Sequence, residues 1–421
     1  GGSFQNGFHL SAISSPSPSP GKVNLTHPHL LSLFFLLMFS QQKWMFIYCI
    51  SSSCRKGAML LNSAIAVVAT VIMYISKPTH SFELILVARF LFGFGAGLGL
   101  NVHTIYLGES SPKKIRGMVT VTATTFMSLG KLLGQFAGLR EILGREECWN
   151  ILLCIPAFFC VVQLAILPFF PDAPRYILIE KGNTQQCRKA LQCLWGPGDY
   201  KLEIEEMLAE QAVIGEEHNK SVLDLLRDKH LHWQVLSMLV INGCIQFSGI
   251  SAYLRHPYRT TYILNIIRYV TLGIGASEVL ISITCGLFIE SVGRRALMWR
   301  GFGGMSAIMA LITVTLYLKD YSSVIPYTTV ILIFLFFIFY GGGPAGVAPS
   351  LINEIFIQSY RPAAFVFVGF LRWLGFTMLG FIFPFLIVNR SNSKFVDFSS
   401  FCCFSSYFSK VCMAVTQDVQ Y

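Results

Sequence analysis

The stretch that decides the fold runs from Arg89 to Gly117 and has the sequence RFLFGFGAGLGLNVHTIYLGESSPKKIRG. It predicts an apolar helix long enough to cross a bilayer, and this helix carries Gly93, Gly95, Gly97 and Gly99. Glycines in an apolar helix let a neighbouring backbone come close, which favours helix association in lipid. The charged turn from Glu109 to Arg116 does not fit in hydrocarbon, so it marks a membrane surface.

The same pattern returns later in the chain. Gly341-Gly342-Gly343-Pro344 lies in an apolar stretch that ends at Glu354, and Arg361 follows at the same Glu-x6-Arg interval as Glu109 and Arg116. A basic cluster precedes each of these turns, at Arg55-Lys56 and at Arg294-Arg295. Two ordered pairs at similar spacing indicate an internal repeat, and duplicated halves with a site between them are typical of secondary transporters.

The composition excludes an ordinary soluble protein. Of the 421 residues, 53% are hydrophobic and only 13% are charged, against roughly 25% charged in a soluble chain. The mean hydropathy is +0.57. We therefore expect an all-α polytopic membrane helix bundle whose direct surroundings are a lipid bilayer.

The charge and the cysteines exclude several other classes. The net charge is +10, but the basic residues lie in short loops beside apolar spans, as the positive-inside rule expects, and not on one solvated face. We therefore expect no nucleic-acid partner. The twelve cysteines have no metal-ligand spacing, so we expect no metal and no cofactor. Because no phosphate loop and no nucleophile–base pattern is present, we expect no enzyme activity.

The first fifty residues are atypical. Residues 1–29 are polar with a Ser-Pro run, and this composition predicts disorder. Asn24-Leu25-Thr26 is a glycosylation sequon, so the chain is a glycoprotein if this end lies outside. Residues 30–50 are long enough for a span or a signal peptide, but Gln41, Gln42 and Lys43 interrupt them and no cleavage site follows.

From Arg55 onward the spans are clear. We expect nine helices of about the 20 residues that a bilayer requires, at residues 58–76, 84–108, 118–138, 150–170, 234–254, 270–289, 297–318, 324–348 and 364–388. Two doubtful ones, at 30–50 and near 395–413, bring the total to between nine and eleven. The loop at 254–268 is atypical, because its arginines fall on the side opposite to the other basic loops.

The expected organisation has five parts. They are an atypical segment at 1–54, an N-terminal transmembrane half at 55–170, a cytoplasmic linker with short amphipathic helices at 171–232, a C-terminal transmembrane half at 233–388, and an atypical tail at 389–421. The acidic face of the linker is either a functional site or a solvated surface, and the solvated surface is the simpler interpretation.

These motifs together resemble the facilitative sugar transporters of the major facilitator superfamily. Glu109-Ser-Ser-Pro-Lys-Lys-Ile-Arg116-Gly117 is similar to the turn after the family's fourth helix, and Pro171-Asp-Ala-Pro-Arg-Tyr176 to the end of the sixth. Gln246-Phe-Ser-Gly-Ile-Ser-Ala252 is similar to the motif of the seventh helix. Leu139-Arg-Glu-Ile-Leu-Gly144 and Phe383-Pro384-Phe385 resemble the branch that carries fructose and urate. The resemblance implies twelve helices in two pseudo-symmetric halves.

Several positions depart from the family pattern. By this resemblance the first helix is absent, residues 1–53 match nothing at the second, and Cys54 replaces a glycine. Residues 253–268 replace the aromatic outer half of helix seven, and residues 389–421 lack a convincing twelfth helix. We expect a truncated or mis-spliced chain. Proton-coupled members use a carboxylate on the first helix, so its absence favours facilitated diffusion.

Two glutamines inside spans, Gln135 and Gln246, are the first candidates for substrate contact. An amide buried without a partner costs on the order of 1–3 kcal/mol, and a sugar hydroxyl suits it because the amide both donates and accepts. A hydrogen bond between helices is the alternative. The resemblance adds Ser251, which replaces a sugar-binding Asn, and the aromatic residues Tyr340 and Trp373. Arg372 lies near the middle of a span, where it either faces the cavity and favours an anion such as urate or faces lipid.

A second set of residues is expected to act on conformation. We expect inter-helix salt bridges that hold one membrane side closed and do not touch substrate, among Arg89, Glu109, Arg116, Glu290, Arg294, Arg295, Glu354 and Arg361. Lys131 and Glu278 are further charges inside spans, to which the sequence assigns no role.

The sequence therefore favours a uniporter of a hexose such as fructose or glucose, or of urate, in the plasma membrane. The alternative is a non-transporting truncated isoform or relic of the same scaffold. The oligomeric state is left open.

Overall fold

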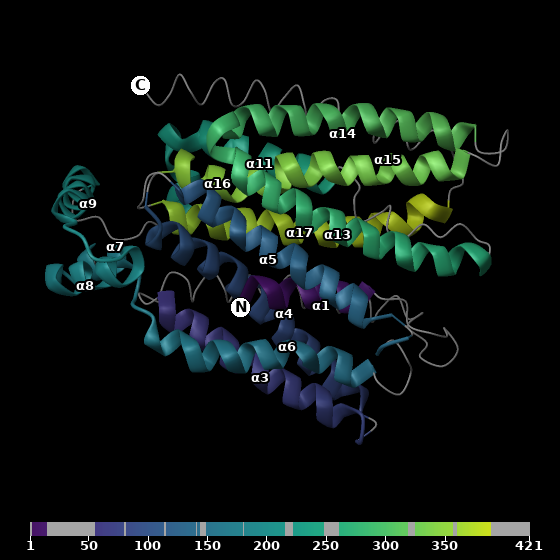
Figure 1. Cartoon of the computed structure of the whole chain (residues 1–421), viewed down its shortest axis with the longest axis horizontal. Helices are drawn as coiled ribbons and strands as arrows, with labels where there is room; N and C mark the ends of the chain where they lie inside the picture. The colour runs from purple at the N-terminus through teal and green to yellow at the C-terminus, as the bar shows by residue number, and fades with distance from the viewer. Residues whose placement is uncertain are drawn as a thin grey trace.

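The computed structural model describes residues 2–14, 55–79, 81–112, 115–139, 141–143, 149–179, 181–214, 222–247, 261–318, 325–356 and 360–388. Within these ranges the regular structure is entirely helical. The helices run roughly along one common direction and form two groups, with the short linker helices at one end (Figure 1). We call this end of the bundle, where α7, α8 and α9 lie, the linker end.

The two groups follow the chain order. The N-terminal group comprises α1 (Gly2–Ser14), α3 (Arg55–Ser76), α4 (Phe82–Ser110), α5 (Arg116–Ala137) and α6 (Trp149–Ile166), followed by the 3-10 turn η2 (Leu167–Phe169). The C-terminal group comprises α11 (His232–Phe247), α13 (Thr261–Val292), α14 (Arg294–Tyr317), α15 (Ile325–Tyr340), the π-helix η4 (Gly341–Ala345), α16 (Gly346–Ile355) and α17 (Arg361–Val388).

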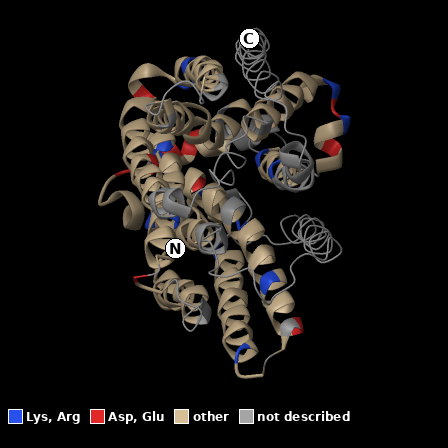
Figure 2. Cartoon of the chain, turned by 90° about the vertical axis from the view of Figure 1, so that its right-hand side faces the viewer, with Lys and Arg blue, Asp and Glu red and all other residues tan. Residues whose placement is uncertain are grey.

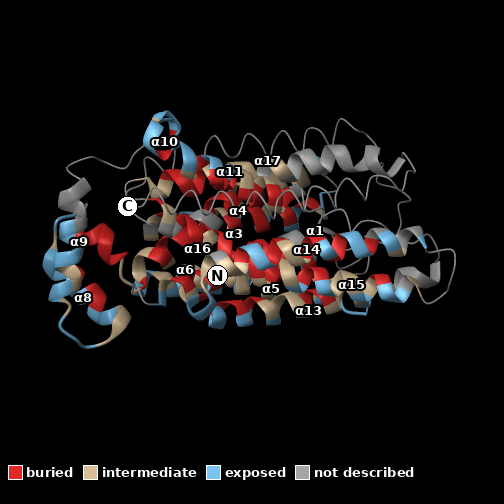
Figure 3. Ribbon diagram, turned by 90° about the horizontal axis from the view of Figure 1, so that it is seen from above, coloured by how far each residue is buried: buried red, intermediate tan, exposed pale blue. Residues whose placement is uncertain are grey.

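The linker is a series of short helices. They are α7 (Pro174–Ile179), α8 (Thr184–Trp195), α9 (Lys201–Ile214), α10 (Val222–Arg227) and the 3-10 turn η3 (Lys229–Leu231). Burial colouring shows that α8 and α9 expose one face and bury the other, whereas buried residues run through the middle of the bundle (Figure 3). Amphipathic helices of this kind were expected from the apolar spacing of residues 202–208 and 222–226.

Most of the helical ribbon carries no charge (Figure 2). Among the described residues, five helical segments are long and apolar enough to cross a bilayer, namely Lys56–Ser76, Glu83–Ser110, Ile151–Phe169, Tyr269–Val292 and Tyr327–Ile352. All five lie in spans expected from the sequence. The expected spans at 118–138, 297–318 and 364–388 coincide with α5, α14 and α17, and α11 covers the expected span at 234–254 as far as Phe247, beyond which the residues are not described. Of these, α5 is less apolar because Thr, Ser and Gly residues recur along it, which suits a helix enclosed between other helices.

The expectation of disorder over residues 1–29 is wrong for Gly2–Ser14, which form α1. This helix packs mainly against α5 and also contacts α4 and α6, so the expected gap at the first helix is partly filled. A Cβ on Gly7 would collide with the backbone of Met127, and a Cβ on Gly130 with that of Phe4. Phe4 and Phe8 are buried in the apolar core of the N-terminal group. The two glycines therefore allow α1 and α5 to pack backbone to backbone.

Helix α13 begins at Thr261 and not near residue 270. The expected atypical loop at 254–268 is therefore wrong from Thr261 onward, because the helix continues outward beyond the predicted span. The remainder of that loop, residues 254–260, lies outside the described residues, as do the doubtful spans at 30–50 and 395–413 and the sequon at Asn24.

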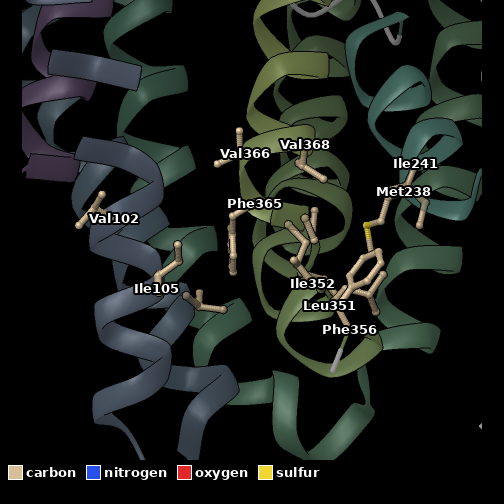
Figure 4. Packing of buried hydrophobic residues seen from close by; sticks show 14 of the residues in the cluster. Val102, Ile105, Met238, Ile241, Leu351, Ile352, Phe356, Phe365, Val366 and Val368 are labelled. Carbon is tan, nitrogen blue, oxygen red and sulfur yellow. The ribbon is translucent and has the colours of Figure 1, made fainter. Parts of the chain in front are cut away.

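The largest apolar core joins the two groups near the linker end. Val102 and Ile105 of α4 belong to the same buried cluster as Phe365 of α17 and Leu351 and Ile352 of α16. The close view shows Phe365 between α4 and the C-terminal group (Figure 4). Both groups therefore share one continuous core at this end of the bundle.

Candidate functional site

Helices α5 and α13 come from different groups and pack against each other over most of their length. We call this contact the α5–α13 seam. Near the linker end, a Cβ on Gly286 would lie 3.8 Å from the Cβ of Val121, an ordinary packing distance. Further along, the hydroxyls of Ser128 and Ser282 are 3.4 Å apart. The seam is thus lined by small residues that bring the two groups close together.

A charged pair crosses the seam one turn further from the linker end. Nζ of Lys131 on α5 donates to Oε1 of Glu278 on α13 at 2.6 Å. The two side chains are only 28% and 12% exposed. Glu278 is also the only Asp or Glu well inside an apolar span anywhere in the sequence. A pair so enclosed contributes through direct contact, because little water is present to screen it.

Two of the predicted substrate residues lie beside this pair. Tyr340, the last residue of α15, is within electrostatic range of Lys131, Glu278 and Arg372. Arg372 of α17 has no ion-pair partner among the described residues, and it lies within electrostatic range of Tyr340 and Lys131. Four helices, α5, α13, α15 and α17, therefore bring two cations, one anion and one phenol together between the two groups.

Gln135 lies at the next turn of the seam. Its Oε1 is buried and accepts no hydrogen bond from a described residue, and it rests against Gly275 of α13, where a Cβ would collide with it. The alternative of a helix–helix hydrogen bond therefore has no support at this oxygen among the described residues. A buried acceptor without a donor is a favourable place for a polar ligand.

Gln246 lies on α11 and is 7% exposed. Its side chain rests against α17, because a Cβ on Gly375 would lie 2.5 Å from Cγ of Gln246. Gly375 follows Arg372 by one turn of α17, so Gln246 packs against the same helix that carries Arg372, and the two glutamines come from different groups. Ser251 lies outside the described residues, and for Trp373 only the backbone position on α17 is described.

The conformational set is concentrated at the linker end. Oε2 of Glu290, at the end of α13, accepts from Nη2 of Arg294, at the start of α14, at 2.8 Å. A Cβ on Gly117 would lie 2.5 Å from Glu290 Oε1 and 2.8 Å from Arg294 Nη2. This pair of the C-terminal group therefore sits directly on the first turn of α5. Contacts of α16 with α5 and of α17 with α4 close the same end.

The other members of the set are placed as follows. Glu109 ends α4 and Arg116 begins α5, and both make further interactions. Arg361 begins α17, and its Nε donates to the carbonyl of Phe356 at 3.1 Å. The side chains of Arg295 and Glu354 lie outside the described residues.

The grouping of Arg89 with Glu109 is corrected by the structure. Both lie on α4, which is one unbroken helix from Phe82 to Ser110. At 1.5 Å per residue they are about 30 Å apart along the axis. Arg89 therefore lies at the end of the bundle opposite to the linker and cannot belong to a salt-bridge network with Glu109.

The linker is attached to both groups. Nε1 of Trp195 on α8 donates to the carbonyl of Ser110 at the end of α4, at 2.9 Å. The hydroxyl of Tyr360, before α17, donates to Oδ2 of Asp228 at 3.0 Å. The backbone N–H of His230 donates to the same carboxylate and, with Tyr360, holds the pKa of Asp228 below its usual range. Sequence reasoning did not identify either attachment.

The sequence of this chain is similar to those of a known protein family. Residues 30–420 match the family model described as Sugar (and other) transporter. The chain belongs to this sugar transporter family. It is 35% identical to the horse (Equus caballus) solute carrier family 2, facilitated glucose transporter member 5, over 97% of this chain and 86% of that protein. It is 38% identical to the human member 9 of the same solute carrier family, over 83% of this chain and 65% of the relative.

Solved structures give the same fold. The proton:xylose symporter XylE of the major facilitator superfamily, bound to 6-bromo-6-deoxy-D-glucose, matches with a TM-score of 0.77 at 15% identity, over 97% of this chain and 92% of that one. The inward open conformation of XylE from E. coli matches with a TM-score of 0.70 at 15% identity, over 97% and 93%. The chain is thus a multi-pass membrane protein with the major facilitator fold, and its family consists of transporters and not enzymes, as the sequence predicted.

Proposed function

We propose that the chain carries out facilitated diffusion of a hexose, such as fructose or glucose, by alternating access. The observation that carries the proposal is the polar cluster between the two groups of helices, because transporters of this kind bind substrate at the interface between their two halves. Gln135 contributes a buried acceptor without a donor. Gln246 contributes an amide from the opposite group, and Tyr340 a phenol. Such groups match the alternating donors and acceptors of a sugar ring.

Uniport is the simplest mode for this site. Helix α1 contains no Asp or Glu, so it offers no carboxylate of the kind that proton-coupled relatives use. The single carboxylate of the cluster, Glu278, already forms an ion pair with Lys131 at 2.6 Å. With the linker on the cytoplasmic side, Arg116 and Arg294 also face the cytoplasm, as the positive-inside rule expects. The proposed location is the plasma membrane.

The decisive experiment is uptake of labelled fructose and glucose by cells that express this chain, normalised to its amount at the surface. Saturable uptake that Gln246→Leu removes would support the proposal. Gln163→Leu on α6 is the matched control, because Gln163 accepts from Gln5 inside the N-terminal group, at 3.5 Å and away from the cluster. Absence of uptake in spite of good surface expression would contradict the proposal and leave a non-transporting member of the family.

A second candidate substrate, urate, is favoured by Arg372. The intramembrane charges are two cations and one anion, so the cluster carries one positive charge that the described residues do not compensate. An anionic solute would balance it. In the same assay, Arg372→Gln should abolish urate uptake and reduce hexose uptake much less. Equal loss of both substrates would contradict the urate assignment.

A further inference from the structure

We propose that the Lys131–Glu278 ion pair is a fixed joint between the two groups of helices, which stays closed while they tilt to alternate access. The proposal rests on the proposed transport function and adds the place about which the motion occurs. Nothing in the family resemblance assigned a role to either residue.

The position of the pair along the seam is the first argument. Lys131 follows Arg116 by fifteen residues, so it lies about 22 Å from the linker end of α5. Glu278 precedes Val292, the last residue of α13, by fourteen residues, which is about 21 Å along the helix. The hydrocarbon core of a bilayer is about 30 Å thick. The pair therefore lies beyond the middle of the bundle, on the side away from the linker.

The second argument comes from the contacts that the two groups of helices make outside the ion pair. A further group of contacts lies at the linker end, where Phe365 shares one buried cluster with Val102 and Ile105 (Figure 4). The Glu290–Arg294 pair also covers Gly117 at this end. These contacts must separate for the linker end to open. The ion pair does not have to separate, because it lies on the far side of the middle.

The third argument is energetic. Removing one partner of an enclosed ion pair leaves an uncompensated charge, which corresponds to a population penalty of roughly 150- to 5,000-fold. A carrier that broke this bond in every cycle would turn over correspondingly more slowly. A joint that remains closed avoids this barrier.

The surface of the seam allows such a motion. Small residues flank the pair, with Ser128 against Ser282 on one side and Gly275 beneath the Gln135 side chain on the other. Small residues let two helices tilt against each other without large side chains interlocking. The pair then acts as a positioning element that fixes the register of α5 on α13, and it need not touch substrate.

Two disulfides on the same pair of helices test the proposal. Val121→Cys/Gly286→Cys places a bond on the linker side of the seam, where the Cβ separation of 3.8 Å fits a disulfide. Ser128→Cys/Ser282→Cys places one next to the ion pair, where the hydroxyls are 3.4 Å apart. The two sites are about 10 Å apart along α5, and the chemistry is otherwise identical. Each variant is compared with its single-cysteine versions and with its own reduced form.

The expected result is that oxidation of the 121/286 variant lowers hexose uptake about tenfold or more, because the linker end can no longer open. Oxidation of the 128/282 variant should leave most of the uptake. If the 128/282 disulfide blocks uptake, or if neither disulfide does, the fixed joint is wrong. The reduced forms separate the two proposals, since a reduced chain that moves no hexose contradicts the proposed function itself.

A second measurement needs no transport. In single-cysteine variants, a membrane-impermeant maleimide added from the linker side should label Cys at position 121 and spare Cys at position 128, as determined by peptide mass. Labelling at both positions contradicts the joint, and labelling at neither shows that the groups do not tilt and contradicts it as well. Lys131→Glu/Glu278→Lys, which restores the pair with reversed charges, should recover the uptake that Glu278→Gln loses, with unchanged KM for hexose.

Discussion

The two glycine-rich helices that begin the sequence argument have different structures. Helix α4 carries its glycines in one unbroken helix of 29 residues. The second stretch is divided into α15, the π-helix η4 and α16. Both end at a glutamate before a basic turn, so the sequence treats them as equivalent. A repeated motif therefore predicts the place of a helix in the bundle, but it does not predict whether that helix is continuous.

The neighbours of the glycines explain the difference. Gly95 and Gly99 of α4 face the side chain of Asn62 from α3, whose amide atoms would lie 2.9 and 2.7 Å from an added Cβ. Gly343 of η4 instead faces backbone, because its Cβ would lie 2.7 Å from Cα of Gly301 on α14. Pro344 has no N–H to donate and its ring clashes with the preceding turn of an α-helix. The π-helix accommodates Pro344 and lets η4 press against α14.

The largest expected effect tests the backbone contact. Gly301→Ala places a Cβ 2.8 Å from Cα of Gly343 and 2.7 Å from Cδ of Pro344, and neither backbone can yield without moving its helix. We expect destabilisation of about 3 kcal/mol, measured as the midpoint of thermal unfolding in detergent.

Gly243→Ala on α11 is the matched control for this substitution. Nothing lies within 4 Å of its added Cβ, so the same change should be neutral or stabilise by up to about 1 kcal/mol through helix propensity. Equal effects of the two substitutions would contradict the tight contact between η4 and α14.

The next prediction concerns the π-helix η4, which separates α15 from α16. Pro344→Ala restores the missing backbone donor, so α15 and α16 can form one continuous helix. We expect unchanged or higher thermal stability and roughly a tenfold lower maximal rate of hexose uptake, if the break at η4 serves as a hinge during transport. Pro156→Ala in the middle of α6 is the control, since that proline lies in an α-helix without a π-turn. A rate for Pro344→Ala equal to wild type would show that the π-helix is not needed for transport.

A smaller effect is expected in α4. Gly99→Ala meets only the end of the Asn62 side chain, which can move, so we expect a loss of about 1 kcal/mol. The double variant Gly99→Ala/Asn62→Ala should recover this loss, because the shorter side chain leaves room for the new methyl group. The measurement is the thermal unfolding midpoint of the two single variants and the double variant. Additive losses would show that the new methyl group does not clash with the Asn62 side chain.

The smallest effect lies at the turn after α16. Tyr360→Phe removes one hydrogen bond to the half-buried Asp228 carboxylate, which we expect to cost less than about 1 kcal/mol. The pKa of Asp228 is lowered in the folded chain, first by the N–H of His230. Its contribution is therefore complete above the ordinary pKa of about 3.9 and is lost as the pH falls through the lowered value.

The measurement is the difference in unfolding midpoint between wild type and Tyr360→Phe, taken at pH 7 and again at a pH below the lowered pKa of Asp228. The difference should be present at pH 7 and vanish at the acidic pH. A difference that grows on acidification would reverse the sign and contradict the assignment.

Hydropathy and motif spacing predicted the membrane class, the family and most helices from Arg55 onward. They failed at α1, because Gln5, Asn6 and the Ser-Pro run that follows α1 have the composition of disorder. In the bundle, Asn6 instead donates to the carbonyl of Ala96 at 3.2 Å. A helix enclosed by other helices can carry polar residues on its inner face, and composition does not distinguish this case from disorder.

The site shows the same limit. Gln135, Tyr340 and Arg372 were singled out as polar or aromatic residues inside spans, and the structure brings the three to one cluster. Lys131 and Glu278 had the same signal, but their pairing across 147 residues of sequence depends on the register of α5 against α13. No local pattern encodes that register. Arg89 shows the converse case. It belongs to the same stretch of sequence as Glu109, but the continuous helix α4 holds the two residues far apart in space.

The attachment of α8 to α4 gives the protein a built-in optical probe. The indole of Trp195 packs edge-on against Tyr200, with ring centroids 5.5 Å apart, and donates to the carbonyl of Ser110. It lies where the last turn of α4 meets the linker. Indole emission shifts to longer wavelength when the ring becomes hydrated, so the fluorescence that Trp195→Phe removes reports directly on whether the linker is docked on the N-terminal group.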